Sequence, residues 1–237
     1  MDYQNVFQRH ELKYFLQNDE YEELKSKILE HMHADKYGET SIQSLYYDTI
    51  DNRLIRYSIE KPLFKEKIRV RSYGIAKPDG NVFLELKRKA YKIVYKRRIA
   101  LPLNKVAPFF NFEIDLDANQ IEKEITYFRN NYKTLRPAMM IIYDRQALFE
   151  DGTDLRITFD RNIRYRTDDL ALDKHLNGTK ILKEGEVLME IKSGTAFPLW
   201  LTNLLTNYKV YKKSFSKYGT AYSRIIKEKM EKGESVL

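Results

Sequence analysis

Charged and apolar residues alternate along several short segments of this chain, and this period of two constrains the fold more than any other feature. Residues 65–71 place Lys65, Lys67, Arg69 and Arg71 on one face. Successive side chains of a β-strand point to opposite faces of the sheet, so the alternation predicts strands with one charged and one apolar face. Related patterns predict further strands over residues 7–14, 42–48, 82–89, 93–101, 138–149, 154–160 and 186–192.

Turn residues and helical periodicity fill the intervals between these strands. The segment 72–81 contains Gly74, Pro78, Asp79 and Gly80, which predicts a hairpin with a long loop between two of the strands. Amphipathic helices are predicted over residues 18–32, with Asn18 as the cap, and over residues 117–132, 197–208 and 216–231.

Many consecutive strands with few helices between them favour an antiparallel sheet over a fold of alternating strands and helices. The predicted fold class is therefore α+β, an eight-stranded antiparallel β-barrel with peripheral helices. A length of 237 residues fits one large domain. We expect a single domain over residues 1–237, with an ordered core over about 5–230.

Several classes of site are excluded by what the chain lacks. There is no cysteine, which excludes disulfides, thiolate metal sites and cysteine nucleophiles. The nine glycines never fall at the spacing of a phosphate-binding loop, and the four histidines form no ligand cluster. No apolar run approaches the ~18 residues of a membrane span, and the N-terminus shows no signal-peptide pattern. A cytoplasmic location is expected.

The net charge of +8 and the pI near 9.3 predict an anionic partner. Two arrangements of the two-faced strands fit the pattern: an apolar interior with a charged outside, or a charged lumen with an apolar outer face covered by helices. The charged faces hold nine cations, Lys13, Arg69, Arg71, Lys87, Lys96, Arg98, Arg145, Arg156 and Lys192, and four carboxylates, Glu11, Glu85, Asp160 and Glu190. A net charge of +5 inside a barrel requires a neutralising anion, such as a condensed phosphate chain, and carboxylates among the cations fit a divalent metal.

The segment Arg9-His10-Glu11-Leu12-Lys13-Tyr14 resembles the first-strand motif of the triphosphate tunnel metalloenzymes, the CYTH-like superfamily. That motif is usually Glu-x-Glu-x-Lys. Arg9 at the first position resembles the VTC branch, the polyphosphate polymerase domain of the vacuolar transporter chaperone complex and its bacterial relatives. The resemblance covers roughly residues 5–225 and continues through Ser44–Asp48, Ile68–Arg71, Leu84–Lys87, Tyr95–Arg98, Tyr143–Arg145, Leu155–Asp160, Leu188–Lys192 and Phe215–Tyr218.

This resemblance implies an eight-stranded tunnel in which the γ-phosphoryl group of ATP is transferred to a polyphosphate chain with Mn²⁺ or Mg²⁺. The catalytic residues expected from it are Arg69, Arg71, Lys87, Arg145 and Arg156. Further phosphate-binding residues are expected to be Lys13, Lys96, Arg98, Lys192, Lys213 and Lys217. Glu190 matches the metal-holding carboxylate of the family, with Glu11 as a second candidate. A second lysine of the family falls on Ser214 here, and the neighbouring Lys213 is expected to serve instead.

Three functions remain open at this level: a polymerase, a metal-dependent tri- or polyphosphatase on the same tunnel, and a non-catalytic polyphosphate-binding module. Hydrolases of the superfamily use several tunnel glutamates, so Arg9 in place of a Glu favours the polymerase or the binder. The expected partners are ATP and polyphosphate or triphosphate, and not nucleic acid. A membrane-protein partner is left open.

Overall fold

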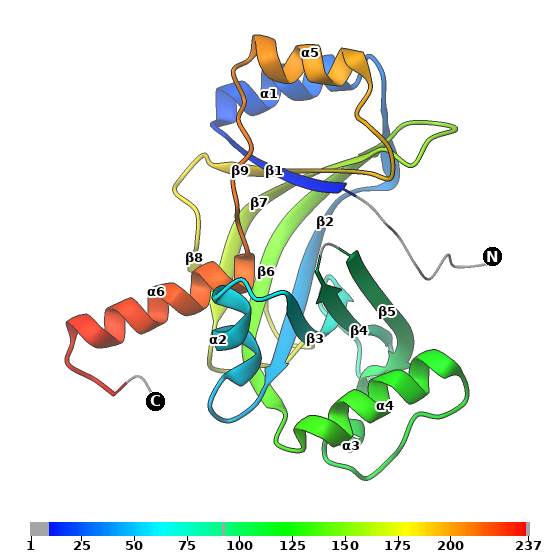
Figure 1. The fold of residues 1–237 in the computed structure, drawn as a ribbon, viewed down its shortest axis with the longest axis vertical. Helices are drawn as coiled ribbons and strands as arrows, with labels where there is room; N and C mark the ends of the chain where they lie inside the picture. The colour runs from blue at the N-terminus through cyan, green and yellow to red at the C-terminus, as the bar shows by residue number, and fades with distance from the viewer. Residues whose placement is uncertain (1–9, 92, 236–237) are drawn as a thin grey trace.

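A computed structural model describes residues 10–91 and 93–235. One antiparallel sheet of nine strands dominates it (Figure 1). Eight strands follow one another in the spatial order β1-β9-β7-β6-β2-β3-β4-β5, and the short β8 pairs with β7. The strands are β1 (His10–Leu16), β2 (His33–Asp48), β3 (Phe64–Tyr73), β4 (Asn81–Ala90), β5 (Ile93–Pro102), β6 (Arg136–Phe149), β7 (Arg156–Arg166), β8 (Thr179–Lys180) and β9 (Val187–Ser193).

Six α-helices and one 3₁₀ turn, Leu103–Lys105, accompany the sheet among the described residues. The helices are α1 (Asn18–Ile28), α2 (Arg53–Ile59), α3 (Val106–Phe110), α4 (Gln120–Tyr132), α5 (Leu199–Asn207) and α6 (Lys217–Glu231). All four predicted helices are present, but the short α2 and α3 were missed. The cap of α1 is Gln17 and not Asn18, since the Gln17 backbone N–H donates to the Glu20 carboxylate at 2.7 Å. None of the described helices has the length and apolarity needed to cross a membrane.

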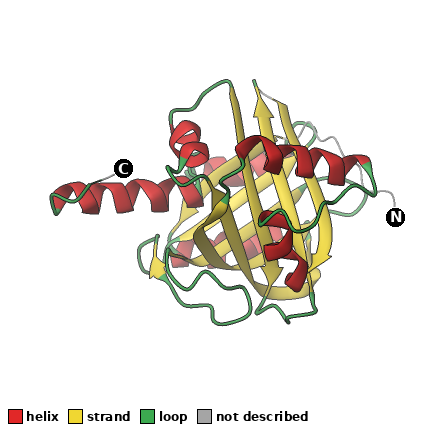
Figure 2. Cartoon of the chain, turned by 90° about the horizontal axis from the view of Figure 1, so that it is seen from below, coloured by secondary structure: helices red, strands yellow, loops and turns green. Residues whose placement is uncertain are grey.

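The prediction of an α+β fold with a large antiparallel sheet is confirmed, but the sheet does not close into a complete barrel. Strands β1 and β5 are the two ends of the hydrogen-bonded path, and within the described residues they do not pair with each other. Figure 2 shows a strongly curved sheet with helices on both faces. The curvature therefore creates an inner and an outer face without joining the two edge strands.

Helices cover the apolar outer face of the sheet at two places. Under α3 and α4, Ile68, Val70, Leu84 and Leu86 of β3 and β4 pack into one buried cluster with Phe128. Under α1 and α5, a second cluster contains buried residues of β7 and β9 together with residues of both helices. Burying one such side chain contributes roughly 1.5–3 kcal/mol. The outer face is thus the mainly apolar one, and most charged side chains of the strands lie on the inner face.

A β-bulge divides the inner face into two parts. The register between β6 and β7 shifts between the pairs of Ile142 and Asp144, and Asn162 in β7 has a φ of 50°. One extra residue in β7 changes which of its alternate side chains point inward. Before the bulge Asp160 points inward, and after it Ile163 and Tyr165 do. There they form an apolar cluster with α2 and α6, to which α6 contributes Ala221 and Tyr222. The rest of α6 projects away from the sheet (Figure 1).

Candidate functional site

The inner face brings together most of the residues predicted for the site. Nine cations lie within 4.0 Å of the four carboxylates Glu11, Glu85, Asp160 and Glu190. The cations are Lys13, Arg69, Arg71, Lys87, Lys96, Arg98, Arg145, Lys192 and Lys217. The net charge of this set is +5. Seven strands and the first residue of α6 supply its members, so the set exists only in the folded chain.

Glu190 and Asp160 form the first acid centre of the inner face. The Lys217 ammonium lies 2.9 Å from Glu190 Oε1 and 2.5 Å from Asp160 Oδ2, between the two carboxylates. The Arg145 guanidinium donates to both Asp160 oxygens at 2.6 and 2.7 Å. Lys192 and Lys13 complete the surroundings of Glu190, at 3.1 and 3.6 Å. Every oxygen of this acid pair therefore faces a cation.

The cations overcome the effect of burial on these two carboxylates. Burial alone would raise the pKa of Glu190, but Lys217, Lys192 and Lys13 hold it well below its usual range. Burial likewise opposes ionisation of Asp160, but Arg145 and Lys217 lower its pKa. In return Asp160 and Glu190 raise the pKa of Lys217. Both carboxylates are ionised at neutral pH and Lys217 is protonated.

Glu85 is the second acid centre, on β4. Its side chain is 2% exposed, and its carboxylate oxygens lie 2.7 Å from a nitrogen of Arg69, 2.7 Å from Lys96 Nζ and 2.6 Å from a nitrogen of Arg98. Arg71 lies at 3.9 Å. Burial raises the pKa of Glu85, but the surrounding cations hold it well below its usual value. One carboxylate thus organises four cations, whose remaining N–H groups stay available to an anion.

Tyrosines complete the hydrogen bonding of the two central arginines. Arg69 Nη1 donates to Tyr46 Oη at 2.9 Å, and Arg71 Nη2 donates to Tyr143 Oη at 3.0 Å. Burial opposes ionisation of both phenols, but neighbouring cations, Arg69 for Tyr46 and Arg71 for Tyr143, lower their pKa values. These contacts hold the guanidinium groups in fixed orientations, which suits directional binding of phosphate oxygens.

Glu11 connects the two acid centres across the inner face. Its carboxylate lies 3.1 Å from Lys13 on β1 and 3.8 Å from Lys87 on β4. Burial acts to raise the pKa of Glu11, but Lys87, Lys13 and Lys192 lower it to about 2. Glu11 therefore holds lysines from the edge strand β1 and from β4 near each other without a backbone pairing between these strands.

The family model of the VTC domain matches residues 8–226. This chain belongs to the VTC-domain family. Its fold is similar to that of a proposed adenylate cyclase from Bacillus halodurans, with a TM-score of 0.55 and 9% identity over 90% of this chain and 94% of the other. A proposed adenylate cyclase from Vibrio parahaemolyticus has a TM-score of 0.50 and 13% identity over 92% of this chain and 99% of the other. None of the curated proteins searched matches the sequence.

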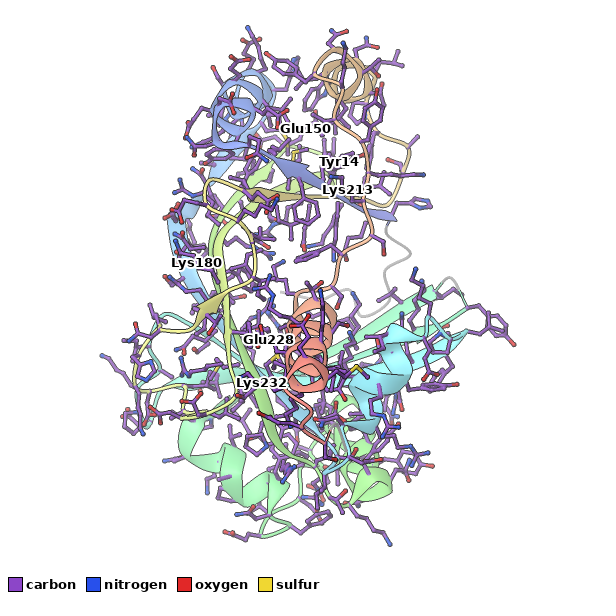
Figure 3. All side chains as sticks on the ribbon, turned by 90° about the vertical axis from the view of Figure 1, so that its left-hand side faces the viewer. Tyr14, Glu150, Lys180, Lys213, Glu228 and Lys232 are labelled. Atoms are coloured by element: carbon purple, nitrogen blue, oxygen red, sulfur yellow. The ribbon has the colours of Figure 1, made fainter. Side chains whose placement is uncertain are left out.

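Two predicted site residues of this VTC-family chain do not join the acid centres. Arg156, at the start of β7, has a side chain that is 52% exposed and pairs with Asp35 at 3.4 Å. Lys213 lies on the connection between α5 and α6, near Tyr14 of β1 (Figure 3). Its backbone N–H donates to the Lys13 carbonyl at 2.8 Å, and its exposed side chain lies over the Phe15 ring. Arg9, whose identity favours the polymerase, lies outside the described residues.

Lys217 reaches the acid centre because buried contacts fix the start of α6. The Ser216 side chain caps the helix by accepting from the Gly219 N–H. Tyr218, which directly follows Lys217, donates through its hydroxyl to Asp48 Oδ2 at 3.0 Å. Asp48 is fully buried and also accepts the backbone N–H groups of Leu54 and Ile55 at the start of α2. This contact joins the two helices and directs Lys217 toward Glu190.

The carboxylates of the inner face fit a divalent metal only when other oxygens complete its coordination. The described residues contain no group of three or more His, Cys, Asp or Glu side chains that could hold a metal by themselves. Mg²⁺, however, is commonly bound by one or two carboxylates together with substrate phosphates and water. Glu190 with Asp160 or Glu11 supplies such hard oxygen donors. The donor set therefore fits a metal that arrives with a phosphate ligand.

Lys67 is one of the inner-face residues that sequence analysis left out of the site. It alternates with Arg69 and Arg71 on β3, and this spacing was the available signal. Its ammonium lies 3.4 Å from Ser216 Oγ and 5.7 Å from the centre of the Tyr218 ring. Burial, with neighbouring lysines, lowers the pKa of Lys67 to about 8. A lysine in these surroundings changes its charge close to physiological pH.

Proposed function

We propose that this chain is a polyphosphate polymerase-like protein that transfers the γ-phosphoryl group of ATP to a polyphosphate chain on the inner face of its sheet. Membership of the VTC-domain family supports the proposal. The observation that carries it is the set of nine cations around four carboxylates, which leaves five positive charges for a bound anion. The proposed location is the cytoplasm, and nucleic acid is not among the proposed ligands.

Phosphoryl transfer depends on positioning and on stabilising charge, without a covalent protein nucleophile. Arg69, Arg71 and Arg145 are the proposed main contacts to the reacting phosphates, because their guanidinium groups are fixed by Glu85, Tyr143 and Asp160. Lys13, Lys87, Lys192 and Lys217 are proposed to bind further phosphate oxygens as point charges. Glu190 would hold the proposed Mn²⁺ or Mg²⁺ ion, which would supply further positive charge to the bound phosphates.

The charge state of the carboxylates favours a phosphate acceptor over water. A general base that activates water works best with a pKa near the operating pH. Cations lower the pKa of Glu11 to about 2 and hold those of Glu85 and Glu190 well below their usual values. The pKa of Asp160 is lowered as well. None of these four carboxylates is placed as an efficient base, which supports transfer to a phosphate chain.

The decisive experiment incubates the protein with ATP and Mn²⁺ and separates the products by size. A ladder of long phosphate chains with ADP supports the polymerase. Orthophosphate alone supports the metal-dependent phosphatase, and intact ATP with tightly bound polyphosphate supports a binding module. The Arg145→Met variant, prepared in parallel, is the control: activity that stays at the wild-type level in it points to a contaminant.

A further inference from the structure

Two consecutive cross-strand pairs on the inner face consist only of lysines. In the register of β3 and β4, Lys65 lies opposite Lys89 and Lys67 lies opposite Lys87. We call these four residues the lysine ladder. Like charges directly opposite each other destabilise a sheet. Two such pairs side by side are therefore expected to serve ligand binding and not the stability of the fold.

The lysine ladder lacks the acid compensation found elsewhere on the inner face. Within the described residues, Lys65, Lys67 and Lys89 have no carboxylate oxygen within 4.0 Å, and Lys87 has only Glu11, at 3.8 Å. Lys65 donates to the Ser58 carbonyl at 3.3 Å, and Lys67 donates to Ser216 Oγ. Neutral oxygens thus replace the carboxylates that surround the arginines. The ladder therefore adds uncompensated positive charge to the excess already present around the acid centres.

Three of the four ladder side chains are only partly hydrated, which increases their mutual repulsion. Lys65, Lys67 and Lys89 are half-buried. Burial lowers the pKa of Lys65, and Lys89, Lys87 and Lys61 lower it further. The groups facing Lys67 from other elements are Tyr46 on β2, Lys87 on β4, Lys13 on β1 and Tyr218 on α6. Among the described residues only Glu11, beside Lys87, lies within 4.0 Å of the ladder, so a bound anion would relieve the remaining repulsion.

We propose that the lysine ladder binds the part of a condensed phosphate chain that extends beyond the two acid centres, so that the protein distinguishes long chains from triphosphates. This inference rests on the proposed function and adds a chain-length preference to it. The ladder occupies the same face of the same two strands as Arg69, Arg71 and Glu85. Inward-facing residues along a strand are about 6.6–6.8 Å apart. An anion anchored at Arg69 therefore reaches the ladder by continuing along the strands.

A condensed phosphate chain matches this path better than a nucleic acid does. Each of its phosphate units carries negative charge and no attached base. Successive phosphates can therefore contact successive lysine pairs along one hairpin. Lysines suit such a ligand because a flexible ammonium binds phosphate as a point charge and imposes little geometry. The fixed arginines at the acid centres suit the reacting phosphates, and the ladder suits the rest of the chain.

The test measures binding of two ligands, tripolyphosphate and a long polyphosphate chain, to a Lys65→Met/Lys89→Met variant. Both residues lie outside the acid centres. Two lost charge-assisted contacts are expected to weaken binding of the long chain about tenfold or more. Binding of tripolyphosphate is expected to change less than about twofold. Lys123→Met, an exposed lysine on α4, is the matched control and should leave both affinities unchanged.

Each other outcome overturns the inference in a recognisable way. If the variant loses affinity equally for the two ligands, or keeps its affinity for the long chain, the ladder does not distinguish chain length. Either result leaves the proposed function intact. Single-stranded RNA that competes as well as polyphosphate shows that the wrong occupant was chosen. A wild-type protein that binds neither phosphate compound removes the proposed function together with the ladder. Lys67→Met provides a second variant, in which the same selective loss is expected.

Discussion

The two faces of the ribbon formed by β3, β4 and β5 differ in how their charges are compensated. On the outer face, Arg88 pairs with Glu66 at 2.5 Å and Arg97 pairs with Glu124 at 2.8 Å. Arg88 also lies 3.8 Å from Glu124, so two arginines and two glutamates form a balanced network. On the inner face, alternate residues of the same strands form the lysine ladder, which has Glu11 as its only near acid among the described residues.

This difference separates a structural network from a candidate ligand site. The outer network borders a hollow of about 740 Å³ under α4, but its charges already satisfy one another. The inner face instead retains positive charge after every described carboxylate has been paired. The expected anion site is therefore where positive charge is left without a carboxylate partner. Neither the number of charged residues nor the size of a hollow indicates it.

The largest effect is expected at the acid that compensates the inner-face arginines. Glu85→Gln leaves Arg69, Lys96 and Arg98 without their shared carboxylate, and we expect a loss of about 3 kcal/mol in the free energy of unfolding. Glu124→Gln on the outer face is the matched change and should cost at most about 1 kcal/mol. Denaturant unfolding measures both. Equal losses would show that the two faces do not differ in the way described.

Removing Glu190 separates activity from anion binding. Because Glu190 is the proposed metal ligand, Glu190→Gln is expected to lower the metal-dependent turnover number about 100-fold or more. Asp160 still pairs with Arg145 and Lys217, so the fold should persist and phosphate binding should hold or tighten. Steady-state kinetics at saturating Mn²⁺, with calorimetry of polyphosphate binding, gives both values. Unchanged turnover would exclude Glu190 as the essential ligand.

Proton uptake on anion binding offers a measurement of the state of Lys67. With a pKa of about 8, Lys67 is about half deprotonated at pH 8 in the free protein. A bound anion raises the pKa, so polyphosphate binding at this pH should take up a fraction of a proton. Burial also lowers the pKa of Lys96, to about 7, so some uptake is expected there too. Calorimetry in two buffers of different ionisation enthalpy measures the total, and Lys67→Met should reduce it.

The same lysine also makes folding stability depend on pH. A lysine in the unfolded chain has a pKa of about 10.4. Between about pH 8 and pH 10.4 the unfolded chain binds more protons at this position than the folded chain does. Its contribution to stability therefore rises with pH across this interval and is constant below it. Comparison of wild type with Lys67→Met at pH 7.5 and pH 9.5 checks the sign; a steeper rise in the variant would contradict it.

The smallest effect is expected in the unliganded ladder. Lys65→Met/Lys89→Met removes a like-charge cross-strand pair and should stabilise the free protein by roughly 0.2–1 kcal/mol. Arg88→Met on the outer face breaks a balanced network and should destabilise it. Thermal unfolding at low ionic strength shows whether each variant has a higher or a lower melting temperature than the wild type. Destabilisation by the lysine variant would show that the ladder contributes to folding in the absence of a ligand.

Much of the fold and of the candidate site followed from local pattern. Alternation of charged and apolar residues predicts strands because side chains of a strand alternate between faces. This argument placed Arg69 and Arg71 on one face and Ile68 and Val70 on the other, as the structure has them. The resemblance to the VTC branch was confirmed by the family match over residues 8–226.

Other features depend on contacts between distant segments, which local pattern does not contain. Alternation left open which face turns inward, and the helices packed on the apolar face decided it. The bulge at Asn162 reverses the alternation within β7, so Ile163 joins the inner face although Asp160 precedes it by three residues.

The sequence by itself determined the eight main strands in outline, their two chemical faces, the excess of positive charge and the family; β8, the first part of β2 and the second half of β7 were missed. Tertiary structure decided that β1 and β5 do not pair with each other in the described residues, that Arg156 pairs with Asp35 outside the acid centres, and that Lys217 lies between Asp160 and Glu190. The physical reason is that strand formation depends on neighbours in the chain, whereas compensation of a charge depends on which distant groups folding brings within a few ångströms of it.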